Sequence, residues 1–227
     1  MRNLITLSTL FLMTTSCQAQ SPTAPAVVEL FQSQGCSSCP PANAVLNALA
    51  DRKDLITLSF SVTYWDYLGW KDSFARPEYT ARQNDYALGL HNPSVYTPQM
   101  VINGRGAIVG TQQAQLDKAL LQFARTGTEP EITKANEGVT IASQAGRAAT
   151  VWLVSYDPRR LDVPIGAGEN AGRTLPHNHI VKQLAKLGEW NGTAQTFALI
   201  PASESGLVSV ILLQKGRGGP IIGAKVL

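Results

Sequence analysis

Two cysteines, Cys36 and Cys39, lie between an apolar strand and a helix in the sequence, and this placement constrains the fold more than any other feature. Residues 27–31 are typical of a short buried strand, and residues 42–50 predict a helix with one apolar face. The two prolines that directly follow the second cysteine fit the first helical turn, where a missing N–H costs no hydrogen bond. The sequence therefore predicts a dithiol at the N-terminus of a helix that follows a strand.

This position favours redox chemistry. Free backbone N–H groups and the positive end of a helix dipole stabilise a thiolate, which is the form that attacks disulfides. We expect Cys36 to be the attacking sulfur and Cys39 the buried resolving sulfur. Ser37 and Ser38 bring no positive charge, so we expect a less extreme oxidant than proteins with histidine between the cysteines. A structural disulfide or half of a zinc site is the alternative, but the sequence has no second Cys-x-x-Cys to complete a four-thiolate cage.

The first residues predict an export signal. Arg2, an apolar stretch too short to remain as a membrane anchor and a small-residue cleavage site ending at Ala19 indicate a signal peptide over residues 1–19, followed by a linker over residues 20–25. An alternative interpretation makes Cys17 the lipid attachment site of a bacterial lipoprotein. Either way Cys17 is removed or modified, which leaves Cys36 and Cys39 as each other's only partners in a periplasmic or secreted protein without a transmembrane anchor.

Charge excludes one class of partner. The chain of 227 residues has a net charge of +3, and its Lys and Arg residues are scattered rather than clustered. Nothing therefore marks an electrostatic footprint for nucleic acid. We expect thiols or disulfides of proteins or small molecules as partners, and no cofactor.

Secondary-structure signals divide the chain in two. Up to about residue 127 they alternate between strand and helix, and an Asn-Gly pair near the end predicts a hairpin. The elements expected after the first helix are a strand at 55–62, an aromatic insertion at 63–95 with a helix at 77–88, hairpin strands at 99–102 and 107–109, and a closing helix after residue 111. Residues 128–227 instead show short β-like runs separated by turn residues, which suggests an antiparallel sandwich. Residues 178–190 also fit a helix, and we interpret them as strand from their context.

Three segments carry a resemblance to a known family: residues 35–41 (GCSSCPP), 62–72 (VTYWDYLGWKD) and 95–104 (VYTPQMVING). They resemble a family of secreted bacterial thioredoxin-like proteins that is catalogued as a domain of unknown function. Residues 168–175 and 218–223 are similar to the second half of that family. The resemblance implies an α/β thioredoxin-like domain over residues 26–127, followed by a small all-β, sandwich-like domain over residues 128–227.

The resemblance also implies roles for three residues near the dithiol. Pro98 would be a cis-proline beside the cysteines, with Thr97 before it, and a plain turn proline is the alternative. Glu29 is similar to the buried acid that moves the proton of the second cysteine in some thioredoxin-like proteins, although an acid at a strand edge is the other interpretation.

Two further groups of residues are weaker candidates. The aromatic side chains of Trp65, Tyr67 and Trp70 either pack in core and loop or form a rim that contacts a substrate. His177 and His179 lie two residues apart, but two ligands make a weak metal site, so structural or surface roles are favoured.

These observations favour an exported thiol–disulfide oxidoreductase whose direction of electron flow the sequence leaves open. One alternative is a metal-handling protein in which the reduced thiols bind a soft ion such as Cu(I), with Met100 or a histidine completing the site. Another is a redox-inert binding module whose β-rich half or aromatic loop recognises a partner.

Overall fold

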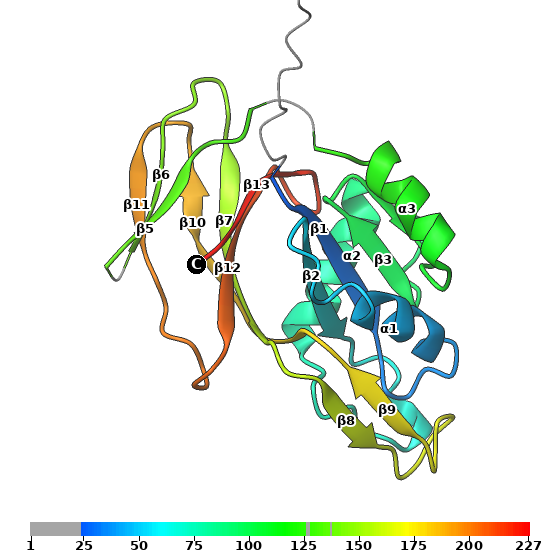
Figure 1. Cartoon of the computed structure of the whole chain (residues 1–227). Helices are drawn as coiled ribbons and strands as arrows, with labels where there is room; N and C mark the ends of the chain where they lie inside the picture. The colour runs from blue at the N-terminus through cyan, green and yellow to red at the C-terminus, as the bar shows by residue number, and fades with distance from the viewer. Residues whose placement is uncertain (1–23, 126–127, 137) are drawn as a thin grey trace, which may run out of the picture.

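A mixed eight-stranded sheet runs through the protein in the computed structural model, which describes residues 24–125, 128–136 and 138–227 (Figure 1). The strand order is β13-β12-β7-β10-β2-β1-β3-β4. The strands of this sheet are β1 (Ala26–Gln32), β2 (Leu55–Ser61), β3 (Gln99–Ile102), β4 (Gly106–Ile108), β7 (Ala149–Asp157), β10 (Ile180–Trp190), β12 (Val208–Gln214) and β13 (Ile221–Val226).

Two smaller sheets and three α-helices complete the fold. The strands of the three-stranded sheet are β11 (Gln195–Ala198), β6 (Gly138–Ile141) and β5 (Ile132–Ala135), and those of the two-stranded sheet are β8 (Leu161–Pro164) and β9 (Thr174–His177). The helices are α1 (Pro40–Asn47), α2 (Pro77–Gly89) and α3 (Gln113–Gln122), with a short 3-10 helix η1 (Asp66–Leu68).

Side chains that alternate along β1 pack against different helices on the two faces of the sheet. Val28 and Leu30 pack with α1 and α3 in one buried apolar cluster. Val27 and Phe31, which point the other way because strand side chains alternate, pack with α2 in a second cluster. The dithiol precedes α1, so the face of Val28 and Leu30 is the face on which the candidate site lies.

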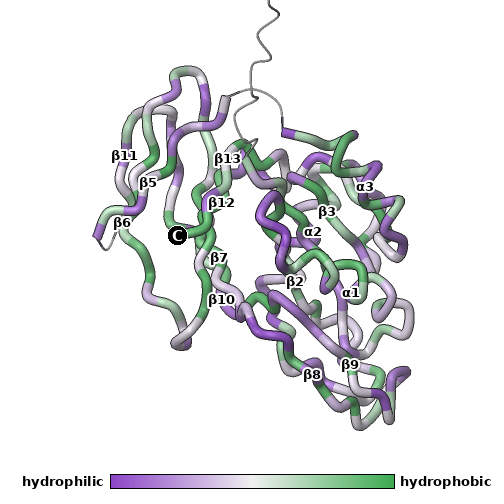
Figure 2. The backbone as a smooth tube through the Cα atoms, in the orientation of Figure 1, coloured by the Kyte–Doolittle hydropathy of each residue, from purple (hydrophilic) through white to green (hydrophobic). Residues whose placement is uncertain are grey.

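The predicted division into a thioredoxin-like domain and a separate β-sandwich-like domain is wrong. Ile180 of β10 pairs in parallel with Ser59 of β2, so strands from both halves of the chain belong to one sheet. Val210 and Leu212 of β12 share a buried cluster with Phe31 of β1. Figure 2 shows that strands after the predicted boundary, including β7 and β12, contain hydrophobic segments.

The two halves of the chain share one sheet because β2, a strand of the first half, has two edges that need pairing partners. All seven residues of β2 are buried, and β1 covers only one edge of it. An uncovered edge would leave backbone hydrogen-bonding groups unpaired, so β10 pairs beside it and the N–H of Ser59 donates to the carbonyl of His179 at 2.9 Å. The turn between β12 and β13 also closes on α2: a Cβ on Gly218, where φ is +64°, would lie 1.8 Å from the carbonyl oxygen of Asp85.

The individual elements agree with the sequence better than the architecture does. The strand–helix–strand crossover, the Asn-Gly hairpin, the helices of the first half and the strand at residues 180–190 are confirmed. The strands β5, β8 and β9 were not predicted. The expected signal peptide and Cys17 lie outside the described residues, and among those described no helix is long and apolar enough to cross a membrane.

Candidate functional site

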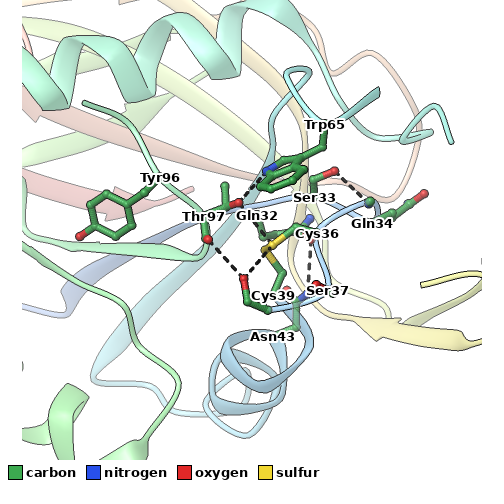
Figure 3. The surroundings of a disulfide bond; sticks show 12 residues. Gln32, Ser33, Gln34, Cys36, Ser37, Cys39, Asn43, Trp65, Tyr96 and Thr97 are labelled. Atoms are coloured by element: carbon green, nitrogen blue, oxygen red, sulfur yellow. Dashed lines mark hydrogen bonds between the residues drawn. A yellow bond between two sulfur atoms is a disulfide. The ribbon is translucent and has the colours of Figure 1, made fainter. Parts of the chain in front are cut away.

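Cys36 and Cys39 form a disulfide at the start of α1, with their Cα atoms 5.5 Å apart (Figure 3). Cys39 is the N-cap residue of the helix, and its carbonyl accepts the N–H of Asn43 at 3.0 Å. Neither cysteine has exposed surface. The pair is therefore placed as the sequence predicts, but it is covered.

The cover over Cys36 consists of hydroxyl groups and an indole ring. The Thr97 hydroxyl donates to Cys36 Sγ at 3.3 Å, and the Ser38 hydroxyl lies at the same distance from that sulfur. Trp65 Nε1 donates to Thr97 Oγ1 at 2.7 Å, as Figure 3 shows. The Thr97-Pro98 peptide bond is cis, as expected. Thr97 and Trp65 are thus brought to the disulfide, and Thr97 touches its sulfur.

A buried amide network lies beneath the disulfide and was missed in the sequence. Asn43 Nδ2 of α1 donates to Gln32 Oε1 at 3.3 Å, and Gln32 Nε2 donates to Ser61 Oγ at 2.7 Å. Gln32 ends β1 with no exposed surface. A glutamine that directly follows an apolar strand and precedes the dithiol was the available signal, because a buried amide requires hydrogen-bond partners.

The loop between β8 and β9 holds the turn that carries Cys36. Asn170 Nδ2 donates to the carbonyls of Gln34 at 2.9 Å and Cys36 at 3.0 Å, and Asn170 is fully buried. Glu169 Oε2 accepts the N–H of Ser37 at 3.0 Å. Hydrogen bonds from Ser37 lower the pKa of Glu169, so its carboxylate is charged at neutral pH. Sequence reasoning missed these contacts because it assigned this loop to a separate domain.

The aromatic loop after β2 supports the same turn from another side. Trp70 Nε1 donates to Gln34 Oε1 at 2.9 Å, and the Trp70 side chain packs against Gly166 with its ring and against Gly168 with its Cβ. Asp72 Oδ2 accepts the N–H of Gln34 at 2.8 Å, and burial raises the pKa of this carboxyl. Tyr67 has 77% of its surface exposed. Of the three predicted rim residues, Trp65 contacts the cover, Trp70 supports the turn and Tyr67 faces solvent.

Glu29 is not brought to the dithiol. Its side chain is fully buried on the α2 face of the sheet, where it accepts from Arg82 Nε at 2.7 Å and from the Tyr86 hydroxyl. Arg82 Nη1 also donates to Gln214 Oε1 of β12 at 3.2 Å. The carboxylate therefore joins β1, α2 and β12 through a buried ion pair, and its predicted proton relay stays a prediction.

No group of three or more His, Cys, Asp and Glu side chains arranged to hold a metal ion occurs among the described residues. His177 is fully buried beside the ring of Phe74, and His179 Nδ1 lies 2.7 Å from Thr57 Oγ1. Met100 packs in the apolar cluster with α1 and α3. Among the described residues, the structure thus shows no group of side chains beside the two thiols that would complete the metal site of the metal-handling alternative.

Comparison with known proteins identifies the family. Residues 27–214 match the family described as "Protein of unknown function (DUF1223)". The chain belongs to this family. The expected membership in a family of unknown function is confirmed, while the secreted and thioredoxin-like character attached to that expectation is not. The chain matches none of the curated proteins with which it was compared.

Two solved structures are similar to the chain. A structural genomics crystal structure of a protein from Agrobacterium tumefaciens has 33% sequence identity and a TM-score of 0.74, covering 92% of this chain and 96% of that one. HBP35 of Porphyromonas gingivalis has 14% identity and a TM-score of 0.57, covering 91% of this chain and 76% of that one. The second likeness concerns the fold alone.

Proposed function

We propose that the protein is an exported thiol–disulfide oxidoreductase that exchanges the Cys36–Cys39 pair with thiols or disulfides of proteins or small molecules. The observation that carries this proposal is the Cys36 sulfur at the start of α1 with the hydroxyls of Thr97 and Ser38 each 3.3 Å away. Hydroxyl donors and the N-terminal end of a helix both favour a thiolate over a thiol.

The reduced pair would act in two steps. The Cys36 thiolate attacks one sulfur of a partner disulfide, which forms a mixed disulfide and releases one partner thiolate. The Cys39 thiolate then attacks Cys36 Sγ, which restores the internal disulfide and releases the second partner thiolate. The partner gains two electrons, the pair loses two, and the same steps run backwards oxidise a partner dithiol.

Exchange requires a small opening, since neither cysteine is exposed in the disulfide form. Ser37 and Ser38 are exposed next to Cys36, and the cover consists of side chains from two loops rather than of packed core strands. Loop side chains reorient on timescales far shorter than those of thiol–disulfide exchange. A shift of Thr97 and Trp65 would expose Cys36 Sγ while α1 stays in place.

Export is a part of the proposal that rests on the N-terminal sequence. Arg2, the apolar stretch after it and the small residues up to Ala19 support a signal that is removed on export. Measuring the N-terminal residue of the mature protein from its host tests this: an N-terminus at or near Gln20 supports export, and retention of residues 1–19 contradicts it.

Variants of the two cysteines test the chemistry. Purified protein that lacks residues 1–19 should catalyse exchange on a model disulfide. Cys36→Ser should abolish catalysis, and Cys39→Ser should accumulate a mixed disulfide between Cys36 and the substrate, detectable by mass. Catalysis that persists in Cys36→Ser, or a Cys39→Ser protein that traps nothing, would reject the proposal.

The complete burial of both cysteines favours a second candidate, a binding module with an inert structural disulfide. Structural disulfides have potentials below about −300 mV and resist the glutathione pool. In that case the pair should stay oxidised in millimolar glutathione, and replacing both cysteines by serine should change the free energy of unfolding without changing any thiol-exchange activity.

A further inference from the structure

Backbone donors are scarce around the Cys36 sulfur. Pro40 and Pro41 remove two N–H groups from the first turn of α1, and the Cys39 N–H already donates to the Cys36 carbonyl at 3.2 Å. The N–H groups of Ser37 and Ser38 remain in the turn between the cysteines. A thiolate at Cys36 would depend on these two donors and on its neighbouring hydroxyls.

One of these two donors is already taken by a carboxylate. Glu169, from the loop between β8 and β9, accepts the Ser37 N–H at 3.0 Å. The next residue, Asn170, is fully buried and donates to the Cys36 and Gln34 carbonyls, so the loop is fixed against the turn by side chains. A negative charge is thus held against the backbone of the residue that directly follows Cys36.

We propose that Glu169 destabilises the Cys36 thiolate and thereby shifts the Cys36–Cys39 pair towards the disulfide, which makes the reduced pair a slightly stronger electron donor to partner disulfides. Glu169 is a positioning residue here, because it acts through the Ser37 N–H and through its charge and makes no contact with the sulfurs. The inference rests on the proposed function and biases the electron flow towards the partner disulfide.

The other charged and titratable groups near this turn are of both signs. α1 has no acidic residue in its first turn and no basic residue in its last turn. On the aromatic loop Asp72 accepts from Gln34 N–H and Asp66 accepts from Asp72 N–H, so that loop adds acidic groups. Tyr64 is kept neutral by burial, which raises its pKa to about 12. Arg173 is a cation of the loop that carries Glu169, and its Nη1 donates to Asn170 Oδ1 at 2.7 Å.

The effect should be modest because the Glu169 side chain is exposed and water screens it. Charges beside helix N-termini shift equilibria by amounts that correspond to roughly half a pKa unit. Removing the charge should therefore lower the pKa of Cys36 by roughly half a unit. Above that pKa the equilibrium with glutathione would shift about threefold towards the reduced pair, which corresponds to a change of about 15 mV in reduction potential.

Glu169→Gln is the test, because the amide oxygen still accepts the Ser37 N–H while the charge is lost. The exposed Glu131, directly before β5, offers a matched control that changes net charge equally, Glu131→Gln. In reduced protein, the pH dependence of Cys36 alkylation should move to lower pH by roughly half a unit in Glu169→Gln and should not move in Glu131→Gln. An unchanged or higher pKa of Cys36 would overturn the inference.

The pH dependence of the glutathione equilibrium gives a second readout. Near pH 5 both thiols are protonated, so the equilibrium constant of Glu169→Gln should equal that of the wild type, and the about threefold difference should appear only near pH 9. A difference of equal size at every pH would show that the substitution merely loosens the loop, and would also overturn the inference. If the wild type does not exchange at all, the proposed function fails, while the alkylation profile still decides the role of Glu169.

Discussion

At the scale of single residues, the contacts of Cys36 define the site. Its sulfur is met by the Thr97 hydroxyl at 3.3 Å, and Thr97 in turn accepts from Trp65 at 2.7 Å. Its carbonyl accepts from Asn170 at 3.0 Å. Thr97 follows Cys36 by 61 positions in the sequence, and Asn170 follows it by 134. The surroundings of the sulfur are therefore set by tertiary structure as much as by the start of α1.

Which of these residues the sequence could reveal depends on how local their signals are. The prolines after Cys39 and the helix that follows are local, and a resemblance was enough to single out Thr97 and Pro98. Gln32 offered only its place between the apolar strand and the dithiol, and Glu169 could not be assigned to the site, because its importance depends on which distant segment folds against the turn. A polar residue in such a place carries no period or spacing that sequence patterns can detect.

His177 gives a prediction for stability against pH. It is fully buried, neither ring nitrogen has a hydrogen-bond partner among the described residues, and burial lowers its pKa from 6.5 to about 4. Between these values the unfolded chain binds a proton that the folded protein excludes, so stability falls as pH drops. We expect a loss of about 3 kcal/mol between pH 7.5 and 4 from this group alone.

Urea unfolding of His177→Leu across that range checks the prediction. The variant should lose less stability than the wild type on acidification, by about 3 kcal/mol, with a small change near pH 7.5 because no hydrogen bond is broken. His91→Asn, a change at an exposed histidine, should retain the acid sensitivity of the wild type. Parallel stability curves for His177→Leu and wild type would contradict the account.

At the scale of elements, the two faces of β1 carry different buried polar side chains. Gln32 lies on the α1 face beneath the disulfide, and Glu29 lies on the α2 face in an ion pair with Arg82 at 2.7 Å. The two positions are three residues apart, so they point to opposite faces of the strand. The alternation of the strand thus places the Glu29 carboxylate on the face away from the dithiol, in a buried ion pair.

Glu29→Gln tests this assignment. Arg82 has 4% of its side chain exposed, so removing the carboxylate leaves a buried charge without a counterion, at a cost of about 3–5 kcal/mol in the free energy of unfolding. The pH profile of thiol exchange should stay that of the wild type. Asp54→Asn, which breaks the exposed pair with Arg52, should cost less than about 1 kcal/mol. A shifted profile for the Cys39 resolving step in Glu29→Gln would instead support a proton relay.

At the scale of the whole molecule, one sheet and one buried apolar cluster include residues from both sides of position 127, where the sequence pattern changes. The change from alternating strand and helix signals to short strands is real at the level of elements. It does not mark a domain boundary, because β10 pairs with the open edge of β2 at Ser59 and β12 packs in the apolar cluster on the α2 face. Pairing partners of strands depend on edges left open elsewhere, which local patterns do not reveal.

Leu212→Ala tests this unity. Leu212 is fully buried in β12 within the cluster that includes Phe31, and its truncation should cost about 2–5 kcal/mol. Hydrogen exchange should show that amides of β1 and β2 lose protection together with those of β12. Leu121→Ala, at an 82% exposed position, should change protection by less than about 0.5 kcal/mol. Loss confined to the second half would indicate two independent units.

The reduction potential of the Cys36–Cys39 pair tests the central claim most directly. Equilibration with glutathione buffers, followed by mass analysis of the trapped thiols, measures it on the intact mature chain. An exchange-active pair without a cation between its cysteines should have a potential between about −300 and −120 mV. A potential below about −300 mV, or a pair that stays oxidised in every glutathione buffer, would show that the disulfide is structural and contradict the account.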